Sequence, residues 1–134
     1  MDLNQITLEA EDFDESVRFY SKIGMKLIVL SEGRYARFES PSGATTLSLH
    51  HAEDPKIGNT VLYFEVDDLS ARYQALLQAG ITFETPPTLE NWLWEEASFA
   101  DPSGNKICLF LAGATRRFPP WRLTTATDLA LVGS

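Results

Sequence analysis

The side chains of this sequence that could perform covalent or acid–base chemistry are few and scattered. There is one cysteine, Cys108, and the two histidines, His50 and His51, are neighbours at the end of an apolar segment. A nucleophilic cysteine needs a basic partner, and the sequence places no histidine beside Cys108. We therefore interpret Cys108 as a small buried apolar residue and the histidines as residues near solvent at the end of a strand.

Aromatic and basic residues gather in two further places. Trp92 and Trp94 lie in a loop, where they could pack against the protein or stack on a ligand. Three of the seven arginines fall between Arg116 and Arg122, in a chain whose formal net charge is −8. We expect this basic segment to dock on acidic residues as a surface strap. A lid, or a contact for an anionic ligand, is the alternative.

Composition limits the class of protein. A chain of 134 residues with 44% apolar and 22% charged residues is typical of a single globular domain. The negative charge argues against a nucleic-acid partner, which would require a basic face. The single cysteine, the lack of a signal-peptide pattern and the lack of an apolar run of about 18 residues predict a cytoplasmic protein with no membrane partner.

Two stretches of the sequence repeat the same order of features. Residues 12–24 begin with an aspartate and end with a glycine, and a Pro-Ser-Gly turn follows at 41–43. Residues 68–80 and 102–104 repeat this order. A solenoid needs at least about three units, so two units predict a pseudo-symmetric domain with one core. A functional site would then lie where the two halves meet.

Each half has the pattern of a strand, a helix and three further strands. Alternating apolar residues indicate the strands, and Asp12 with Glu15 forms a capping-box pattern at the start of the first helix. The predicted fold is α+β, with two β-α-β-β-β modules whose strands are mostly antiparallel. We predict strands over residues 5–10, 25–30, 35–39, 45–50, 60–66, 82–83, 95–100 and 106–111, with helices over 12–24 and 68–79.

Several short motifs occur in an order that resembles the vicinal oxygen chelate superfamily of glyoxalase-like, bleomycin-resistance-like and dioxygenase-like proteins. They are Phe19-Tyr20 in the first helix, Val66-Asp67-Asp68 before the second, and Asp101-Pro-Ser-Gly-Asn105 in the last turn. The resemblance implies a domain over residues 1–111, with modules at 3–51 and 59–111. Their curled sheets would form a cleft that a second subunit often completes, so we expect a homodimer. Residues 112–134 would form an extension, as a strap or a flexible tail.

The resemblance also implies where a metal ion would bind. Members with a metal use four cleft-facing ligands, whose places correspond to Gln5, Ser48, Val61 and Cys108. Gln5 matches a ligand of some glyoxalases, but valine has no lone pair and the serine hydroxyl is a weak neutral ligand. We therefore predict no metal and no cofactor. The alternative is an altered set of Gln5, His50 and Cys108, which would suit zinc better than magnesium.

Strand alternation predicts which side chains face the helices and which face the cleft. The helix side is apolar and should form the core; it comprises Phe38, Leu47, Leu49, Leu62, Phe64, Ile107 and Leu109. The opposite face is mostly apolar and aromatic with a few hydrogen-bonding groups, which suits a flat organic ligand. It comprises Gln5, Thr7, Tyr35, Arg37, Ser48, His50, Val61, Tyr63, Ser98, Cys108 and Phe110, with Trp92 and Trp94 in the nearby loop.

These patterns favour a protein that binds a small organic molecule in its cleft without a metal ion. One alternative is a metal-dependent lyase or dioxygenase of the glyoxalase type with an altered ligand set, so the sequence leaves open whether the protein is an enzyme. The other is a regulatory or assembly module with a vestigial cleft. The metal content of protein purified without chelator distinguishes the first two hypotheses best.

Overall fold

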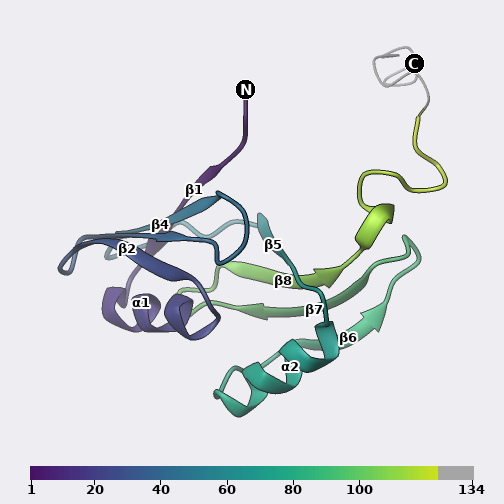
Figure 1. Ribbon diagram of the computed structural model, residues 1–134. Helices are drawn as coiled ribbons and strands as arrows, with labels where there is room; N and C mark the ends of the chain where they lie inside the picture. Colours follow the sequence, from purple (N-terminus) through teal and green to yellow (C-terminus); the bar gives the residue numbers. More distant parts are fainter. Residues whose placement is uncertain (124–134) are drawn as a thin grey trace.

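The computed structural model describes residues 1–123 as two modules of one topology (Figure 1). The first contains β1 (Gln5–Ala10), α1 (Phe13–Lys22), β2 (Lys26–Ser31), β3 (Tyr35–Glu39) and β4 (Thr46–His51). The second contains β5 (Val61–Glu65), α2 (Leu69–Gln78), β6 (Thr85–Leu89), β7 (Glu95–Ala100) and β8 (Lys106–Leu111), followed by the short helix η1 (Gly113–Thr115). The predicted α+β fold of two β-α-β-β-β modules is confirmed. No helix within residues 1–123 is long and apolar enough to span a membrane.

Each module has its own four-stranded sheet. The strand orders, β1-β4-β3-β2 and β5-β8-β7-β6, are equivalent. The first and last strands of each module are parallel neighbours, while the other pairs are antiparallel. The sheets do not close into a barrel, because β1 and β5 each pair on one side only. These two strands are therefore open sheet edges.

Local sequence signals set the ends of both helices. The carboxylates of Asp12 and Asp68 each accept a hydrogen bond from the backbone N–H three residues later, at 3.0 Å. Such N-caps satisfy a donor that the first turn of a helix leaves unpaired. Past the other end, Gly24 and Gly80 have φ values of 113° and 94°. This left-handed conformation suits glycine and ends each helix.

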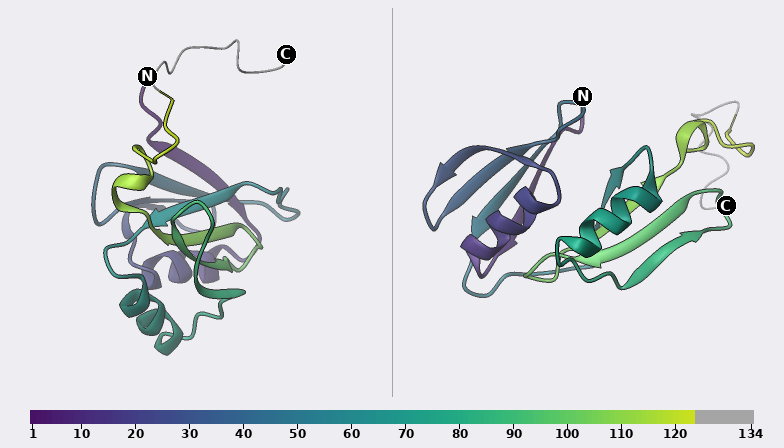
Figure 2. Two further views of the ribbon diagram at one scale, coloured as in Figure 1. Left: turned by 90° about the vertical axis from the view of Figure 1, so that its right-hand side faces the viewer. Right: turned by 60° about the horizontal axis from the view of Figure 1, so that its bottom comes forward.

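One hydrophobic core runs through both modules. Figure 1 shows both helices on the same side of the sheets, and Figure 2 shows each helix lying across its own sheet. Because β-strand side chains alternate between faces, every second strand residue points towards a helix. The strand residues predicted for the helix side all belong to this core or pack against it; they are Phe38, Leu47, Leu49, Leu62, Phe64, Ile107 and Leu109.

A buried hydrogen-bond network joins α1 to the turn between β7 and β8. The Tyr20 hydroxyl donates to Asp101 Oδ2 at 2.7 Å, and both residues are buried. The same carboxylate accepts the backbone N–H groups of Ser103 and Asn105, at 3.0 and 2.8 Å, and the Asn105 side-chain amide at 2.8 Å. The aspartate of the predicted turn motif therefore fixes one module against the other.

One strand lies elsewhere than the sequence predicts. A short strand at 82–83 and a loop through Pro86-Pro87 were expected, but β6 covers Thr85–Leu89 and includes both prolines. β6 is an outer strand that pairs only with β7, and its register is irregular between Thr85 and Thr88. An edge strand with an irregular register accommodates the missing N–H groups of proline, which a central strand would not.

Candidate functional site

On the first sheet, the predicted cleft residues form a continuous hydrogen-bond chain. Arg37 Nε donates to the Tyr35 hydroxyl at 2.9 Å, and this hydroxyl lies 2.7 Å from Ser48 Oγ. Gln5 Nε2 donates to Ser48 Oγ at 2.6 Å, while Gln5 Oε1 accepts a hydrogen bond from Thr46 Oγ1. Ser48 is fully buried, so this chain satisfies a hydroxyl that water does not reach.

His50 and Thr7 lie on the same face. The His50 ring meets the Tyr35 ring edge-on, with centroids 5.0 Å apart, and the Arg37 guanidinium lies 5.5 Å from the Tyr35 ring centre. Thr7 is the β1 neighbour of Ser48. The hydrogen bond from Ser48 lowers the pKa of Tyr35, and Arg37 adds to this effect against a smaller opposing contribution from burial.

On the second sheet, three rings form an aromatic cluster made of Tyr63, Trp94 and Phe110. Trp94 and Phe110 are stacked, with centroids 4.8 Å apart and an interplanar angle of 25°. Tyr63 meets both rings edge-on, at 6.1 and 5.6 Å. Phe110 is buried, whereas Tyr63 is 52% exposed. The cluster is therefore held from within the protein and open to solvent at Tyr63.

Glu96 lies in the same face and was not identified from the sequence. It is the β7 neighbour of Phe110. Trp92 Nε1 donates to Glu96 Oε2 at 2.6 Å, and Cys108 Sγ lies 3.6 Å from Glu96 Oε1. Within residues 1–123, no lysine or arginine forms an ion pair with Glu96. The signal for it was available, because Glu96 shares its strand and face with the predicted residue Ser98.

A tight turn presents both tryptophans to this face. Leu93 has a φ of 74° and is the one non-glycine residue with positive φ in the described part of the chain. Glu90 N–H donates to the Trp94 carbonyl at 2.8 Å, and Leu93 N–H donates to the Glu90 carbonyl at 3.0 Å. Such three-residue loops end in a left-handed residue, which is costly for leucine. The conformation lets Trp92 reach Glu96 while Trp94 stacks in the aromatic cluster.

The residues at the four places of the family's metal ligands do not fit a metal ion. Gln5 and Ser48 are bonded to each other, and Val61 has no donor atom. Burial, with a nearby carboxylate, raises the pKa of the Cys108 thiol to about 12, whereas metals bind the thiolate. The alternative zinc set would also need Gln5, whose amide is hydrogen-bonded to Ser48, and the protonated Cys108 thiol. No group of three or more His, Cys, Asp and Glu side chains within residues 1–123 could hold a metal ion.

The Cys108 thiol should make stability depend on alkaline pH. Its folded pKa is raised from 9.0 to about 12, so the unfolded thiol loses its proton first. The buried, protonated thiol therefore makes its full contribution to the free energy of unfolding below pH about 9, and this contribution is lost as the pH rises towards about 12. Urea unfolding between pH about 8 and about 11 should show a smaller loss of unfolding free energy for Cys108→Ala than for the wild type. Equal losses would contradict the buried, protonated thiol.

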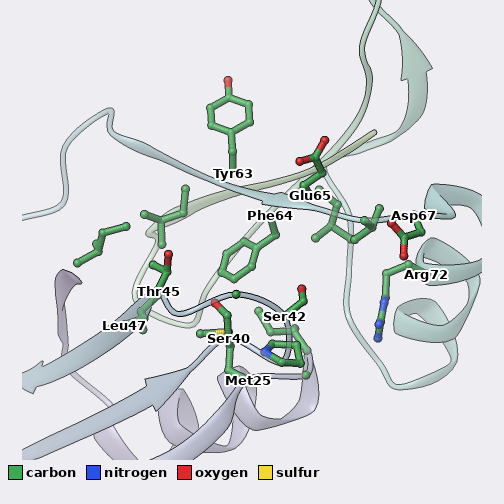
Figure 3. A pocket seen from close by; sticks show the side chains of 18 of the residues that line it. Met25, Ser40, Ser42, Thr45, Leu47, Tyr63, Phe64, Glu65, Asp67 and Arg72 are labelled. Atoms are coloured by element: carbon green, nitrogen blue, oxygen red, sulfur yellow. The ribbon is translucent and has the colours of Figure 1, made fainter. Parts of the chain in front are cut away.

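A cavity of about 1000 Å³ lies between the two modules. Figure 3 shows Phe64 pointing into this cavity and Tyr63 pointing away from it. Met25 and Leu47 also line it, which places most of the cavity on the helix side of the sheets. Of the predicted cleft residues, it is lined by Val61 and Tyr63 alone. The inter-module cavity therefore lies mainly on the helix side of the sheets and meets the helix-free face at Val61 and Tyr63.

The sequence profile of the Glyoxalase/Bleomycin resistance protein/Dioxygenase superfamily matches residues 2–109. The chain belongs to this superfamily. No functionally curated protein matches this member of the superfamily.

Solved structures of the superfamily share the fold. A glyoxalase/bleomycin resistance protein/dioxygenase from Nocardioides has a TM-score of 0.70 and 25% identity, with 84% of this chain and 83% of that chain covered. A lactoylglutathione lyase from Agrobacterium tumefaciens has a TM-score of 0.69 and 19% identity, with 82% and 92% covered. A bleomycin-binding protein complexed with bleomycin has a TM-score of 0.66 and 23% identity, with 83% and 98% covered. The last two likenesses show the fold alone.

The described segment after β8, residues 112–123, forms one ion pair with the sheets. Arg116 Nε lies 3.8 Å from Glu65 Oε1 on β5. Arg117 and Arg122 both lie over the Phe118 ring, at 5.5 and 4.6 Å. Within residues 1–123, this one ion pair supports the prediction that the tail docks on acidic residues as a strap. Residues 124–134 of the predicted tail lie outside the described part of the chain.

Proposed function

We propose that this glyoxalase-like protein binds a small organic molecule on the helix-free faces of its sheets, without a metal ion. The observation that carries the proposal is the aromatic cluster of Tyr63, Trp94 and Phe110. In this cluster Trp94 stacks on the buried Phe110 ring, while the Tyr63 ring is exposed to solvent. Rigid aromatic surfaces with a few polar groups are typical of sites for flat organic ligands.

The donor atoms at the metal positions support metal independence. The side-chain amide of Gln5 is hydrogen-bonded to Ser48 and Thr46, and the Cys108 thiol is buried and protonated. A metal ion would have to displace both these hydrogen bonds and the thiol proton in order to bind. The bleomycin-binding protein of the same fold supports organic-ligand binding as a function that this fold can serve.

Ligand titration tests the proposal. Binding of planar aromatic compounds should quench tryptophan fluorescence, and Tyr63→Ala should weaken binding by about 1–3 kcal/mol, because one aromatic contact is lost. Added salt should change the affinity little, since buried contacts are poorly screened. Ser42→Leu is the matched control, because exposed Ser42 lines the inter-module cavity. Loss of binding in Ser42→Leu alone would place the ligand in that cavity instead.

Metal analysis separates this proposal from the enzyme alternative. We expect no stoichiometric divalent metal in protein purified without chelator. One tightly bound zinc or iron per chain that is lost in His50→Ala would favour a metal-dependent lyase or dioxygenase. If no aromatic compound binds and Tyr63→Ala changes nothing, the assembly-module alternative becomes the better hypothesis.

We also propose that the protein forms a homodimer. β1 and β5 are open edges, and β5 exposes Val61 and Tyr63 to solvent. An open edge that carries apolar side chains is a site for pairing with another chain, and a twofold interface would cover both edges at once. Sedimentation should give a species of twice the 15.0 kDa chain mass. A monomer at micromolar concentration would contradict the dimer.

A further inference from the structure

The hydrogen-bond chain on the first sheet leads towards Tyr35. Gln5 Nε2 can only donate, so it fills one acceptor position of Ser48 Oγ at 2.6 Å. Arg37 Nε can also only donate, so it fills one acceptor position of Tyr35 Oη at 2.9 Å. One bond is left without a fixed direction, the 2.7 Å contact between Ser48 Oγ and Tyr35 Oη.

Burial decides the direction of this contact. Ser48 is fully buried, and Tyr35 Oη is the one acceptor that its hydroxyl reaches in the described part of the chain. If Tyr35 donated, the Ser48 O–H would be buried without an acceptor, at a cost of about 1–3 kcal/mol. If Ser48 donates, both hydroxyls are satisfied, because Tyr35 is partly exposed and its O–H can point outwards. We therefore assign Ser48 as the donor.

Tyr35 then accepts two hydrogen bonds and has its own O–H free. Two accepted hydrogen bonds make a phenol a stronger donor. The other groups around the ring are His50 on β4, which meets it edge-on, and Ser31, its neighbour on β2. No carboxylate among them competes for the O–H.

Arg37 places a positive charge beside this free hydroxyl. Its guanidinium is half-buried and forms no ion pair with any carboxylate within residues 1–123. Nε is used by Tyr35, so the terminal Nη groups keep their donors. The Arg37 guanidinium and the Tyr35 O–H are therefore two adjacent hydrogen-bond donors with one unpaired positive charge. Such a pair can bind an oxyanion.

We propose that the Tyr35 hydroxyl and the Arg37 guanidinium form an oxyanion site that binds the carboxylate of a small organic acid. This rests on the proposed function and names the class of its ligand. A carboxylate is favoured over a phosphate because one guanidinium balances one negative charge, while a second charge would stay uncompensated in a chain of net charge −8. Two places of the family's metal ligands, Gln5 and Ser48, would then serve to orient Tyr35.

Paired acids and amides test the site. Calorimetry with benzoate and 2-naphthoate, against benzamide and 2-naphthamide, should show the acids binding at least about tenfold more tightly, because hydrogen bonds to a charged group are the stronger ones. Tyr35→Phe and Arg37→Met should each remove most of this difference, because each lost donor weakens binding of the charged acid more than binding of the neutral amide. Arg34→Met is the matched control, because exposed Arg34 precedes β3 and carries the same charge.

The outcomes separate the two proposals. Acids and amides that bind equally, with an affinity that still depends on Tyr63, would overturn the oxyanion site and leave the proposed function standing. Failure of all four compounds to bind would overturn both. An equal effect of Arg34→Met and Arg37→Met would show a general charge effect and overturn the site.

A spectroscopic test needs no ligand. Tyrosinate absorbance should show a step below the ordinary pH range of tyrosine, because the pKa of Tyr35 is lowered, and Tyr35→Phe should remove that step. Ser48→Ala should move the step to higher pH, because the donor that stabilises the phenolate is lost. A step that Ser48→Ala leaves in place would overturn the assigned hydrogen-bond direction.

Discussion

Replacing Asp101 with alanine should lower the free energy of unfolding by about 3–5 kcal/mol, because it breaks a buried hydrogen-bonded network. Asp101 is 5% exposed, and its carboxylate accepts four hydrogen bonds, one from Tyr20 and three from the turn that it begins. The substitution leaves the buried Tyr20 hydroxyl without its acceptor and removes the anchor between the modules. Urea denaturation followed by circular dichroism measures the change.

Two variants show which part of the network matters. Tyr20→Phe removes one hydroxyl and keeps the turn, so it should cost about 1–2 kcal/mol. Asp14→Ala changes an exposed carboxylate in the first turn of α1 and should cost no more than about 1 kcal/mol. If Asp101→Ala costs no more than Tyr20→Phe, the turn bonds add nothing to stability. The whole cost would then come from the Tyr20–Asp101 hydrogen bond that joins the modules.

Features that depend on neighbours in the sequence were predictable. The N-caps at Asp12 and Asp68 need only a carboxylate that can accept a hydrogen bond from the backbone N–H three residues later, in the first turn of the helix. Gly24 and Gly80 adopt the positive φ that ends each helix and that few other residues adopt. Strand alternation then assigned the core face. β6 was misplaced because a pair of prolines is a loop signal in the sequence, and its position at the sheet edge is a property of the whole fold.

The site was less predictable, because it depends on strand register and on how the modules meet. The faces of Gln5 and Ser48 follow from alternation, but their bond joins residues 43 positions apart in the sequence and needs the β1–β4 register. Glu96 was missed because a glutamate on a strand is normally a solvated residue. A site where the two halves meet was expected, but most of the side chains that line the inter-module cavity were not predicted, because residues such as Phe64 read as ordinary core residues.

Phe99→Ala should also cost about 3–5 kcal/mol of unfolding free energy, the range for removing a large buried aromatic side chain. Phe99 is 1% exposed on β7. Its ring lies 5.9 Å from Phe19 of α1 and 4.9 Å from Phe83 of the second module, so it contacts both modules. Phe99→Leu keeps most of the apolar volume and should cost less, about 1–2 kcal/mol.

Calorimetry shows whether this ring couples the modules. Because one core cluster contains residues of both modules, we expect the wild type to unfold in a single transition, with equal van't Hoff and calorimetric enthalpies. Leu77→Ala is the matched control, since Leu77 is 39% exposed on α2 and does not belong to this core cluster. A loss in Phe99→Ala no larger than in Leu77→Ala would contradict the shared core. Two separate wild-type transitions, with only one shifted by Phe99→Ala, would show that each module is stable by itself and that the Tyr20–Asp101 bond joins two independently folded units.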